Sequence, residues 1–545
     1  MFAGLPSTHG ANKRESRVDS AGGTFQIRHW TLLGLVLLFH PRVLHAENCE
    51  GLTALKWPTV TISSAGKVLS GFTPPGTTDN LKSPPFCRVV GIARPTSDSE
   101  INFEVWIPLD REYHDLLGEG NGGYNGALPY ARMAYALRRG FATAGTDTGH
   151  TGSDLKFGAG HPEKIVDWGH RAIHVMTASA KRIIAGYSGN PVRHSYFEGC
   201  STGGGQGLSE AQRYPGDYDG IIAGDPGNNR VHLNVGFLWA FAATHNSEGK
   251  PILPSAKLPL INKAAIAVCD ELDGVVDGII SDPPSCHFDP AVLLCKGAED
   301  EQCLTTEELA AVKKVYGGPR NPRTAELIIA GYSPGSESPA GDVWAEGWKR
   351  YITDPKEPMR ADFWRYWVFN DASWDWRKFD YDRDVAFADR KLAALNATDT
   401  NLGAFKARGG KLLMYSGWAD PTGPPMDAVQ YYTRVVKRLG GRRHTDEFFR
   451  LFMVPGMAHC DYGPGPNMFG GVGPRMAEGQ GDPTHDILAA LVRWVEEGKP
   501  PSQIVASHRT NGVVDRTRPL CPYPKKARWT RRGSSDDAAN FTCQH

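Results

Sequence analysis

Residues 199–203, with the sequence GCSTG, have the residue types of a turn that carries a nucleophilic serine. They fit the pattern G-x-S-x-G, follow a strand-like run at residues 194–199 and precede a segment of helical character at residues 205–214. In this pattern a tight strand-to-helix turn exposes the serine hydroxyl, and free N–H groups of the helix can stabilise an oxyanion. The lysine of a phosphate-binding loop, GxxxxGK[ST], is missing. We therefore expect Ser201 to attack a carbonyl carbon, with a tight turn that carries no chemistry as the alternative.

A nucleophilic serine needs a histidine as base and a carboxylate that orients the histidine. Asp420 follows the apolar run at residues 411–417, and His459 follows a second run at residues 448–457. The order serine, acid, histidine is that of the α/β-hydrolases, in which each residue follows a strand of the sheet. Asp225 also follows an apolar run and is an alternative acid, but it precedes the middle region of the chain, and the pattern favours Asp420. In these roles His459 transfers the proton of Ser201, and Asp420 fixes the tautomer and stabilises the imidazolium.

Two backbone N–H groups are expected to bind the oxyanion of a tetrahedral intermediate. One belongs to Thr202, the residue after the serine, and the other belongs to the loop after an earlier strand. Residues 118–126, GEGNGGYNG, follow a strand predicted to end at residue 109 and contain the glycines that a closely approaching loop requires. This favours Gly122 or Gly123 as the second donor, and an ordinary flexible loop is the alternative.

The elements that must position these residues are predicted to alternate between strands and helices. Strand patterns occur at residues 101–109, 140–147, 194–199 and 411–417, and apolar residues recur at helical spacing over residues 170–187. Strands that alternate with helices are typical of a parallel sheet covered by helices. The sequence therefore predicts the α/β class.

The middle of the chain, residues 228–402, has a different character. It contains four of the ten cysteines, several tryptophans and short helical patterns that proline and glycine interrupt. Such a change is typical of a lobe inserted into an α/β core. We predict that residues 47–227 and 403–545 form the core, with the nucleophile in the first part and the acid and histidine in the second part.

The charge and the N-terminus limit the partners and the location of the protein. Lys plus Arg and Asp plus Glu each number 60, and no basic tract interleaves with aromatic residues, so nucleic acid is not an expected partner. Residues 1–46 have the order of a signal peptide: a basic start, an apolar run at residues 31–39 and a small-residue stretch that ends at Ala46. The apolar run is much shorter than the roughly 20 residues of a membrane span. We expect no stable membrane insertion and a secreted or periplasmic protein.

All ten cysteines follow the expected signal peptide, and their even number suits disulfides in an oxidising compartment. The sequence has no C-x-x-C pair, which argues against a zinc site. Cys200 precedes the predicted nucleophile, and Cys460 follows the predicted histidine. If Ser201 and His459 lie within hydrogen-bonding reach, these two cysteines come within reach of a disulfide. A cysteine nucleophile at either position is the alternative.

Together, GCSTGG, Asp420 at a strand end and AHC at residues 458–460 resemble the CS-D-HC arrangement of the tannase and feruloyl esterase family. The resemblance covers residues 49–543 and implies an α/β-hydrolase core with a large inserted lid domain at residues 228–402. It implies a secreted serine carboxylesterase that acts through an acyl-enzyme on small esters of aromatic acids, feruloyl, galloyl or similar, including plant-derived ones, without an organic cofactor. The family also includes a bacterial mono(2-hydroxyethyl) terephthalate hydrolase, so a terephthalate half-ester is an alternative substrate. The disulfides that the resemblance implies are Cys49–Cys87, Cys200–Cys460, Cys269–Cys286, Cys295–Cys303 and Cys521–Cys543.

Residues 269–280, CDELDGVVDGII, carry carboxylates at Asp270, Asp273 and Asp277. Three hard oxygen donors on a glycine-bent loop suit Ca²⁺, but the spacing is not that of an EF-hand, and a solvated acidic turn explains it equally well. The family resemblance implies a structural calcium ion held by these three carboxylates and by the backbone carbonyls of Val275 and Ile279.

The residues that bind the substrate are less clear in the sequence. By the resemblance, the lobe covers the serine and supplies the pocket for the acid half of the ester. The aromatic segment at residues 363–376 could stack on an aromatic acyl group or form the core of the lobe. Arg365 could pair with a substrate carboxylate or with a carboxylate of the protein. A non-catalytic binding module on a hydrolase scaffold would lack a member of the triad, whereas all three positions are filled here.

Overall fold

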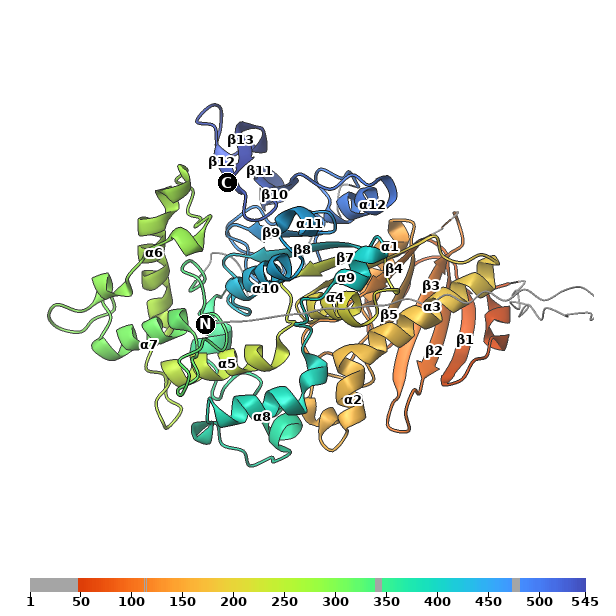
Figure 1. The fold of residues 1–545 in the computed structure, drawn as a ribbon, viewed down its shortest axis with the longest axis horizontal. Helices are drawn as coiled ribbons and strands as arrows, with labels where there is room; N and C mark the ends of the chain where they lie inside the picture. The colour runs from red at the N-terminus through yellow and green to blue at the C-terminus, as the bar shows by residue number, and fades with distance from the viewer. Residues whose placement is uncertain (1–47, 112, 114, 339–345, 473–480) are drawn as a thin grey trace, which may run out of the picture. The chain divides into compact units, whose positions relative to one another are not determined.

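The computed structural model describes residues 48–111, 113, 115–338, 346–472 and 481–545 (Figure 1). The expected signal peptide at residues 1–46 lies outside these ranges and stays a prediction. Within the described part of the chain, no helix is both long and apolar enough to cross a bilayer.

A nine-stranded mixed sheet forms the centre of the fold. Its strands are β1 (Val60–Val68), β2 (Phe86–Ala93), β3 (Ile101–Pro108), β4 (Asp115–Glu119), β5 (Ala142–Thr146), β6 (His194–Cys200), β7 (Gly220–Gly224), β8 (Lys411–Gly417) and β9 (Phe449–Val454). Their order in the sheet is β1-β2-β3-β5-β4-β6-β7-β8-β9. The strands from β5 to β9 in this order run parallel to one another, and β1, β2 and β3 pair antiparallel. The predicted α/β class is therefore correct.

Four strand patterns of the sequence correspond to strands of the central sheet, whereas β2 and β4 were not predicted although they are largely buried. Strands β6, β7 and β8 are buried along nearly their whole length, and strands covered on both faces form continuous apolar runs in the sequence. The patterns at residues 101–109, 140–147, 194–199 and 411–417 correspond to β3, β5, β6 and β8. Strand β1, at the edge of the sheet, is mostly exposed and polar, so no apolar run predicted it.

Helices cover both faces of this sheet. Helices α3 (Ala172–Ser188), α4 (Thr202–Arg213) and α10 (Pro425–Arg438) pack into the apolar cluster on one face, and α1 (Tyr130–Arg138) and α12 (Ile487–Glu497) pack on the other face. Helix α3 corresponds to the helical pattern at residues 170–187. Two short helices, α2 (Pro162–Val166) and α11 (Arg442–Thr445), lie in connections.

The carboxyl ends of the parallel strands meet at one edge of the sheet, which is where α/β folds bind ligands. Ser201 directly follows β6, and Asp225 directly follows β7. Asp420 and His459 follow β8 and β9 within a few residues. The topology therefore brings four chemically active side chains to neighbouring strand ends.

The long connection between β7 and β8 forms the inserted lobe. Its helices are α5 (Arg230–Thr244), α6 (Leu258–Cys269), α7 (Thr306–Gly317) and α8 (Arg383–Lys391), and α9 (Gly403–Ala407), at the end of the connection, packs on the core through Phe405. Figure 1 shows α6 and α7 on the side of the sheet away from β1 and β2. One apolar cluster lies within the lobe, and a second is shared with Tyr124 and Trp168 of the core. The lobe thus packs directly on the core, and the predicted boundary at residues 228–402 stays a prediction.

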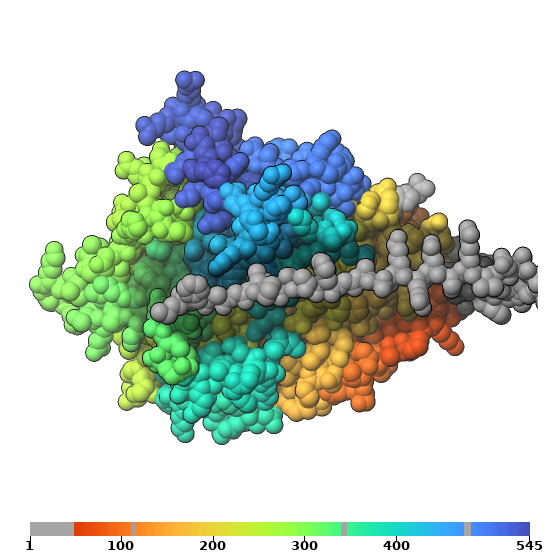
Figure 2. Space-filling model, viewed as in Figure 1, coloured from red at the N-terminus to blue at the C-terminus, as the bar shows by residue number. Residues whose placement is uncertain are grey.

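The C-terminal segment forms two small sheets that are separate from the central one. Strands β10 (Ile504–Thr510) and β11 (Val513–Leu520) pair with each other, as do β12 (Lys526–Trp529) and β13 (Phe541–Gln544). Figure 2 shows this segment, in blue, against the surface of the lobe, in green, and two ion pairs join them: Arg518 with Asp277, and Lys526 with Asp282. The segment therefore braces the lobe from outside.

All ten cysteines form disulfides. The pairs are the five that the family resemblance implies: Cys49–Cys87, Cys200–Cys460, Cys269–Cys286, Cys295–Cys303 and Cys521–Cys543. No thiol is left to act as a nucleophile, which removes the cysteine-nucleophile alternative.

Candidate active site

Ser201 lies on a strained turn between β6 and α4. Its φ and ψ are 62° and −117°, a conformation that a non-glycine residue rarely adopts. Neighbouring backbone holds it there, since Ser201 N donates to the Gly224 carbonyl at 2.9 Å and Gly227 N donates to the Ser201 carbonyl at 2.9 Å. This is the geometry that G-x-S-x-G predicts for an exposed nucleophile.

The glycines around Ser201 are required by close backbone contacts. A Cβ atom on Gly199 would lie 2.5 Å from the carbonyl carbon of Gly203, and one on Gly204 would lie 2.2 Å from the carbonyl oxygen of Gly224. Any side chain at these two positions would push helix α4 away from β6 and β7. The local sequence therefore fixes the turn through sterics as well as through backbone conformation.

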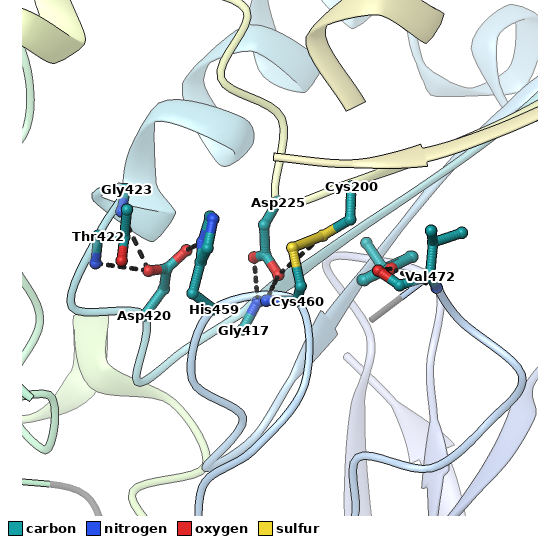
Figure 3. The surroundings of a disulfide bond; sticks show 10 residues. Cys200, Asp225, Gly417, Asp420, Thr422, Gly423, His459, Cys460 and Val472 are labelled. Carbon is teal, nitrogen blue, oxygen red and sulfur yellow. Dashed lines mark hydrogen bonds and ion pairs between the residues drawn. A yellow bond between two sulfur atoms is a disulfide. The ribbon is translucent and has the colours of Figure 1, made fainter. Parts of the chain in front are cut away.

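His459 and Asp420 form an oriented pair at the ends of β9 and β8 (Figure 3). His459 Nδ1 lies 2.7 Å from Asp420 Oδ2, and Asp420 Oδ1 accepts hydrogen bonds from the N–H groups of Thr422 and Gly423 at 2.6 and 3.0 Å. Burial opposes the charged imidazolium, but Asp420, followed by Asp225, outweighs it and raises the pKa of His459 to about 9. The pair therefore stabilises a protonated His459, as a proton-transferring triad requires.

Asp225, the alternative acid, holds backbone rather than the histidine. Its Oδ1 accepts from Gly417 N at 2.8 Å and its Oδ2 from Cys460 N at 2.7 Å, so it ties the end of β7 to the end of β8 and to the loop that carries His459. Figure 3 shows it between the disulfide and the pair of His459 and Asp420. Burial and then the charge of Asp420 raise the pKa of Asp225. The geometry favours Asp420 as the partner of His459 and gives Asp225 a positioning role that the sequence did not indicate.

The Cys200–Cys460 disulfide joins the residue before the serine to the residue after the histidine. Its Cα atoms are 5.9 Å apart, and the two cysteines are 260 residues apart in the sequence. The nucleophile turn and the histidine loop thus share a covalent link in addition to the hydrogen bonds of Asp225.

The glycine-rich loop after β4 packs against the start of helix α4. Asn121 N donates to Gln206 Oε1 at 2.9 Å, and Thr202 Oγ1 donates to the Gly123 carbonyl at 2.7 Å. Gly122 and Gly123 line the same cavity as Ser201. Thr202 is the first residue of α4, where backbone N–H groups lack partners within the helix. Gln206, which fixes the loop to the helix, was missed because glutamine in a helix carries no sequence signal of its own.

A cavity of about 780 Å³ lies over Ser201, Asp420 and His459. The lobe closes it with residues that the sequence did not single out: Arg230, Leu233, Phe237, Ile329, Tyr351 and Arg360. The aromatic segment at residues 363–376 does not line it, since Phe363, Trp364 and Trp367 are fully buried in the cluster shared with the core. Arg365 pairs with Glu357 and Asp362, which is the structural alternative of the two considered.

The acidic loop in the lobe is folded around Asp270. Its carboxylate accepts hydrogen bonds from the N–H groups of Asp277, Gly278 and Ile279, and Asp273 Oδ1 accepts from Val275 N. Asp277 Oδ2 pairs with Arg518 at 2.5 Å, and Asp277 Oδ1 is buried with no hydrogen-bond partner within the described residues. A hard cation would satisfy that orphaned carboxylate oxygen. Both oxygens of Asp270 already accept backbone hydrogen bonds, and Asp277 also pairs with Arg516 and Arg518, so the calcium site stays a prediction.

Comparison with known proteins places these features in one family. The family model described as "Tannase and feruloyl esterase" matches residues 87–544. The chain is 42% identical to an uncharacterized esterase of Xanthomonas campestris pv. campestris, with 91% of each chain covered. It is 34% identical to a probable feruloyl esterase B-2 of Aspergillus fumigatus, covering 86% of this chain and 88% of that protein.

Two solved structures share the fold. The crystal structure of feruloyl esterase B from Aspergillus oryzae superposes with a TM-score of 0.84 at 29% identity, covering 91% of this chain and 99% of that chain. Tannin acyl hydrolase from Aspergillus niger superposes with a TM-score of 0.71 at 19% identity, covering 90% and 92%. The likeness therefore extends over the core and the lobe together.

Proposed function

The chain belongs to the tannase and feruloyl esterase family of carboxylic ester hydrolases, and we propose that it hydrolyses esters of aromatic acids through an acyl-enzyme on Ser201. The observation that carries this proposal is the 2.7 Å contact between His459 and Asp420, at the same cavity as a serine on a strained strand-to-helix turn.

In the proposed reaction, Ser201 Oγ attacks the ester carbonyl carbon and His459 Nε2 takes the hydroxyl proton. The N–H groups of Thr202 and Gly122 stabilise the oxyanion. Collapse of the intermediate breaks the bond to the alcohol, which leaves with the proton from His459, and the acid stays as an ester of Ser201. Water then gives a proton to His459 and attacks the acyl carbon. The bond to Ser201 Oγ breaks, His459 returns the proton to Ser201 and the free acid is released. Asp420 holds His459 in the required tautomer throughout.

The walls of the cavity support an aromatic acid. Phe237 and Tyr351 line the cavity with aromatic side chains, and Leu233 and Ile329 add apolar surface. Aromatic rings pack on such surfaces with specific geometry. The names of the relatives, feruloyl esterase and tannin acyl hydrolase, agree with this class of substrate.

We also propose that the protein is secreted and carries a structural calcium ion. Five disulfides suit an oxidising compartment, and residues 1–46 have the order of a signal peptide. The calcium ligands would be the carboxylates of Asp270, Asp273 and Asp277 with the carbonyls of Val275 and Ile279. The ion would stiffen the lobe and take no part in hydrolysis.

A substrate panel tests the proposed function. Wild-type protein and Ser201→Ala are compared on methyl ferulate, methyl gallate, chlorogenate and mono(2-hydroxyethyl) terephthalate. We expect hydrolysis of at least one ester by the wild type and a loss of more than about 10³-fold in kcat in the variant, because the nucleophile is gone. A variant that retains full activity would exclude Ser201 as the nucleophile.

A further inference from the structure

Arg230, the first residue of α5, is a buried cation without a counter-ion. Its side chain is 6% exposed, and it forms no ion pair within the described residues. Its guanidinium donates to Thr202 Oγ1 at 2.9 Å and lies over the rings of Tyr124 and Trp168, at 5.5 and 5.2 Å. A guanidinium has five N–H donors, and buried arginines are normally paired with anions. Burial of the unpaired charge of Arg230 therefore costs free energy.

Arg360, which is partly exposed, is a second arginine at the same cavity. Its guanidinium lies 5.1 Å from the ring centroid of Tyr124, and a Cβ atom on Gly123 would lie 3.6 Å from its Nη2. It forms no ion pair within the described part of the chain, and its backbone adopts φ of 63°, which is strained for a residue with a side chain. Arg365, five residues further along the chain, forms ion pairs with the two nearby carboxylates, Glu357 and Asp362. The segment thus has acids, but none faces Arg360.

The two arginines also act on each other. Burial lowers the pKa of Arg230, and the charge of Arg360 lowers it further. The acids that line the cavity are engaged elsewhere: Asp420 holds His459, Asp225 holds the backbone of Gly417 and Cys460, and Asp427 faces Arg434 and His232. An anion beside Arg230 would offset both its burial and the like charge of Arg360.

We propose that Arg230 and Arg360 bind a carboxylate of the substrate, so that the preferred esters are anionic. Arginine binds carboxylates through paired, charge-assisted hydrogen bonds. Arg230 donates to Thr202 beside Ser201, and Arg360 lines the same cavity near Gly123, so a carboxylate held between them lies close to the reacting ester group. This inference rests on the proposed function, because it specifies the substrate class of the same site.

A binding experiment tests the role of Arg230 and Arg360 without relying on turnover. Calorimetric titration of Ser201→Ala compares benzoate with its neutral isostere benzamide. We expect benzoate to bind at least about tenfold more tightly, because charge-assisted hydrogen bonds are the stronger ones. Arg230→Gln or Arg360→Gln, added to Ser201→Ala, should each weaken benzoate binding about tenfold and leave benzamide binding unchanged.

Arg365→Gln is the matched control, since its guanidinium is already neutralised, and it should bind benzoate as the parent does. Equal affinity for benzoate and benzamide, or unchanged benzoate binding in both arginine variants, would overturn the proposal. If Arg230→Gln has a lowered melting temperature, the partly exposed Arg360 still provides the test.

Matched esters then locate the carboxylate on the acid or the alcohol half. Methyl 4-carboxybenzoate is compared with methyl 4-carbamoylbenzoate, and benzoyloxyacetate with benzoyloxyacetamide. A preference of at least about tenfold for the anion in kcat/KM in the first pair assigns the acid half, and in the second pair the alcohol half. Hydrolysis of the esters with no preference in either pair would contradict the proposal, whereas selective benzoate binding with no ester hydrolysed would contradict the proposed function instead.

Discussion

The charged side chains on the two sides of the active-site cavity differ in whether the protein supplies them with partners. On the core side, His459 faces Asp420, and Asp420 and Asp225 accept hydrogen bonds from the backbone of four residues. On the lobe side, Arg230 and Arg360 have aromatic rings, a hydroxyl group and each other as neighbours, and no carboxylate within the described residues.

This difference separates reaction from recognition. Groups that carry out chemistry gain from partners that fix them before the substrate arrives, because no reorganisation is then needed during the reaction. A charged group that selects a substrate is more selective when no protein group neutralises it, because the substrate then supplies the counter-ion. The core is therefore expected to determine whether the protein is an esterase, and the lobe which ester it prefers.

The largest effect is expected from removing the fixed partner of the histidine. Asp420→Asn should lower kcat about 10³- to 10⁴-fold, because the histidine loses the carboxylate that orients it and stabilises its charge. The measurement is kcat on a neutral aryl ester, with the melting temperature as a control for folding. A loss below about tenfold would show that the core side is not preorganised through this contact.

A smaller loss is expected when the covalent link on the core side is removed. The double variant Cys200→Ser, Cys460→Ser should lower kcat/KM by about 10- to 100-fold, because misplacement of reacting groups by about 1 Å has effects of this size. The chain-entropy model also predicts a loss of about 5 kcal/mol in stability for so long a loop.

The matched control removes a disulfide of the lobe. Cys295 and Cys303 are only 8 residues apart, and replacing both by serine should keep kcat/KM within about twofold of the wild type. Equal losses in the two double variants would mean that the link beside Ser201 has no special role.

A moderate, pH-dependent effect is expected for Asp225→Asn. His459 must be neutral to accept a proton. Asp420, Asp225 and Asp461 outweigh its burial and raise its pKa to about 9, so the kcat/KM of the wild type should rise as the pH approaches that value. Removing the negative charge of Asp225 lowers this pKa, and we expect the rise to occur about one pH unit lower. A pH profile that does not move would show that Asp225 acts only through the backbone of Gly417 and Cys460.

The smallest effect on turnover is expected from calcium removal. Chelation should lower the melting temperature by about a few degrees, because a bound ion stabilises only the folded state. The kcat/KM at 25 °C should stay within about twofold of its original value, since Asp270, Asp273 and Asp277 do not line the cavity. Asp273→Asn should make the melting temperature less sensitive to chelator, and a wild-type melting temperature that chelation leaves unchanged would contradict the site.

The sequence predicted those parts of the structure that depend on residues close together in the chain. The turn at Ser201 follows from G-x-S-x-G and the glycines that its contacts require, and a buried parallel strand such as β8 is largely an apolar run. The lobe was less predictable: its tryptophans have the composition of a binding surface, yet Trp364 and Trp367 form its core. Composition does not specify which side of a helix faces a cavity.

The sequence by itself determined the α/β class, the chemical type of the three active-site residues, and the cysteines next to two of them. These features depend on residue type, order and short-range sterics, which are written directly in the chain. Only the tertiary structure decided that Asp420 and not Asp225 contacts His459, that Gln206 holds the glycine loop, and that Arg230 and Arg360 share one cavity and form no ion pair with any residue that the structure describes. Those relations join segments up to hundreds of residues apart, and a pattern along the chain contains no information on which distant side chains meet.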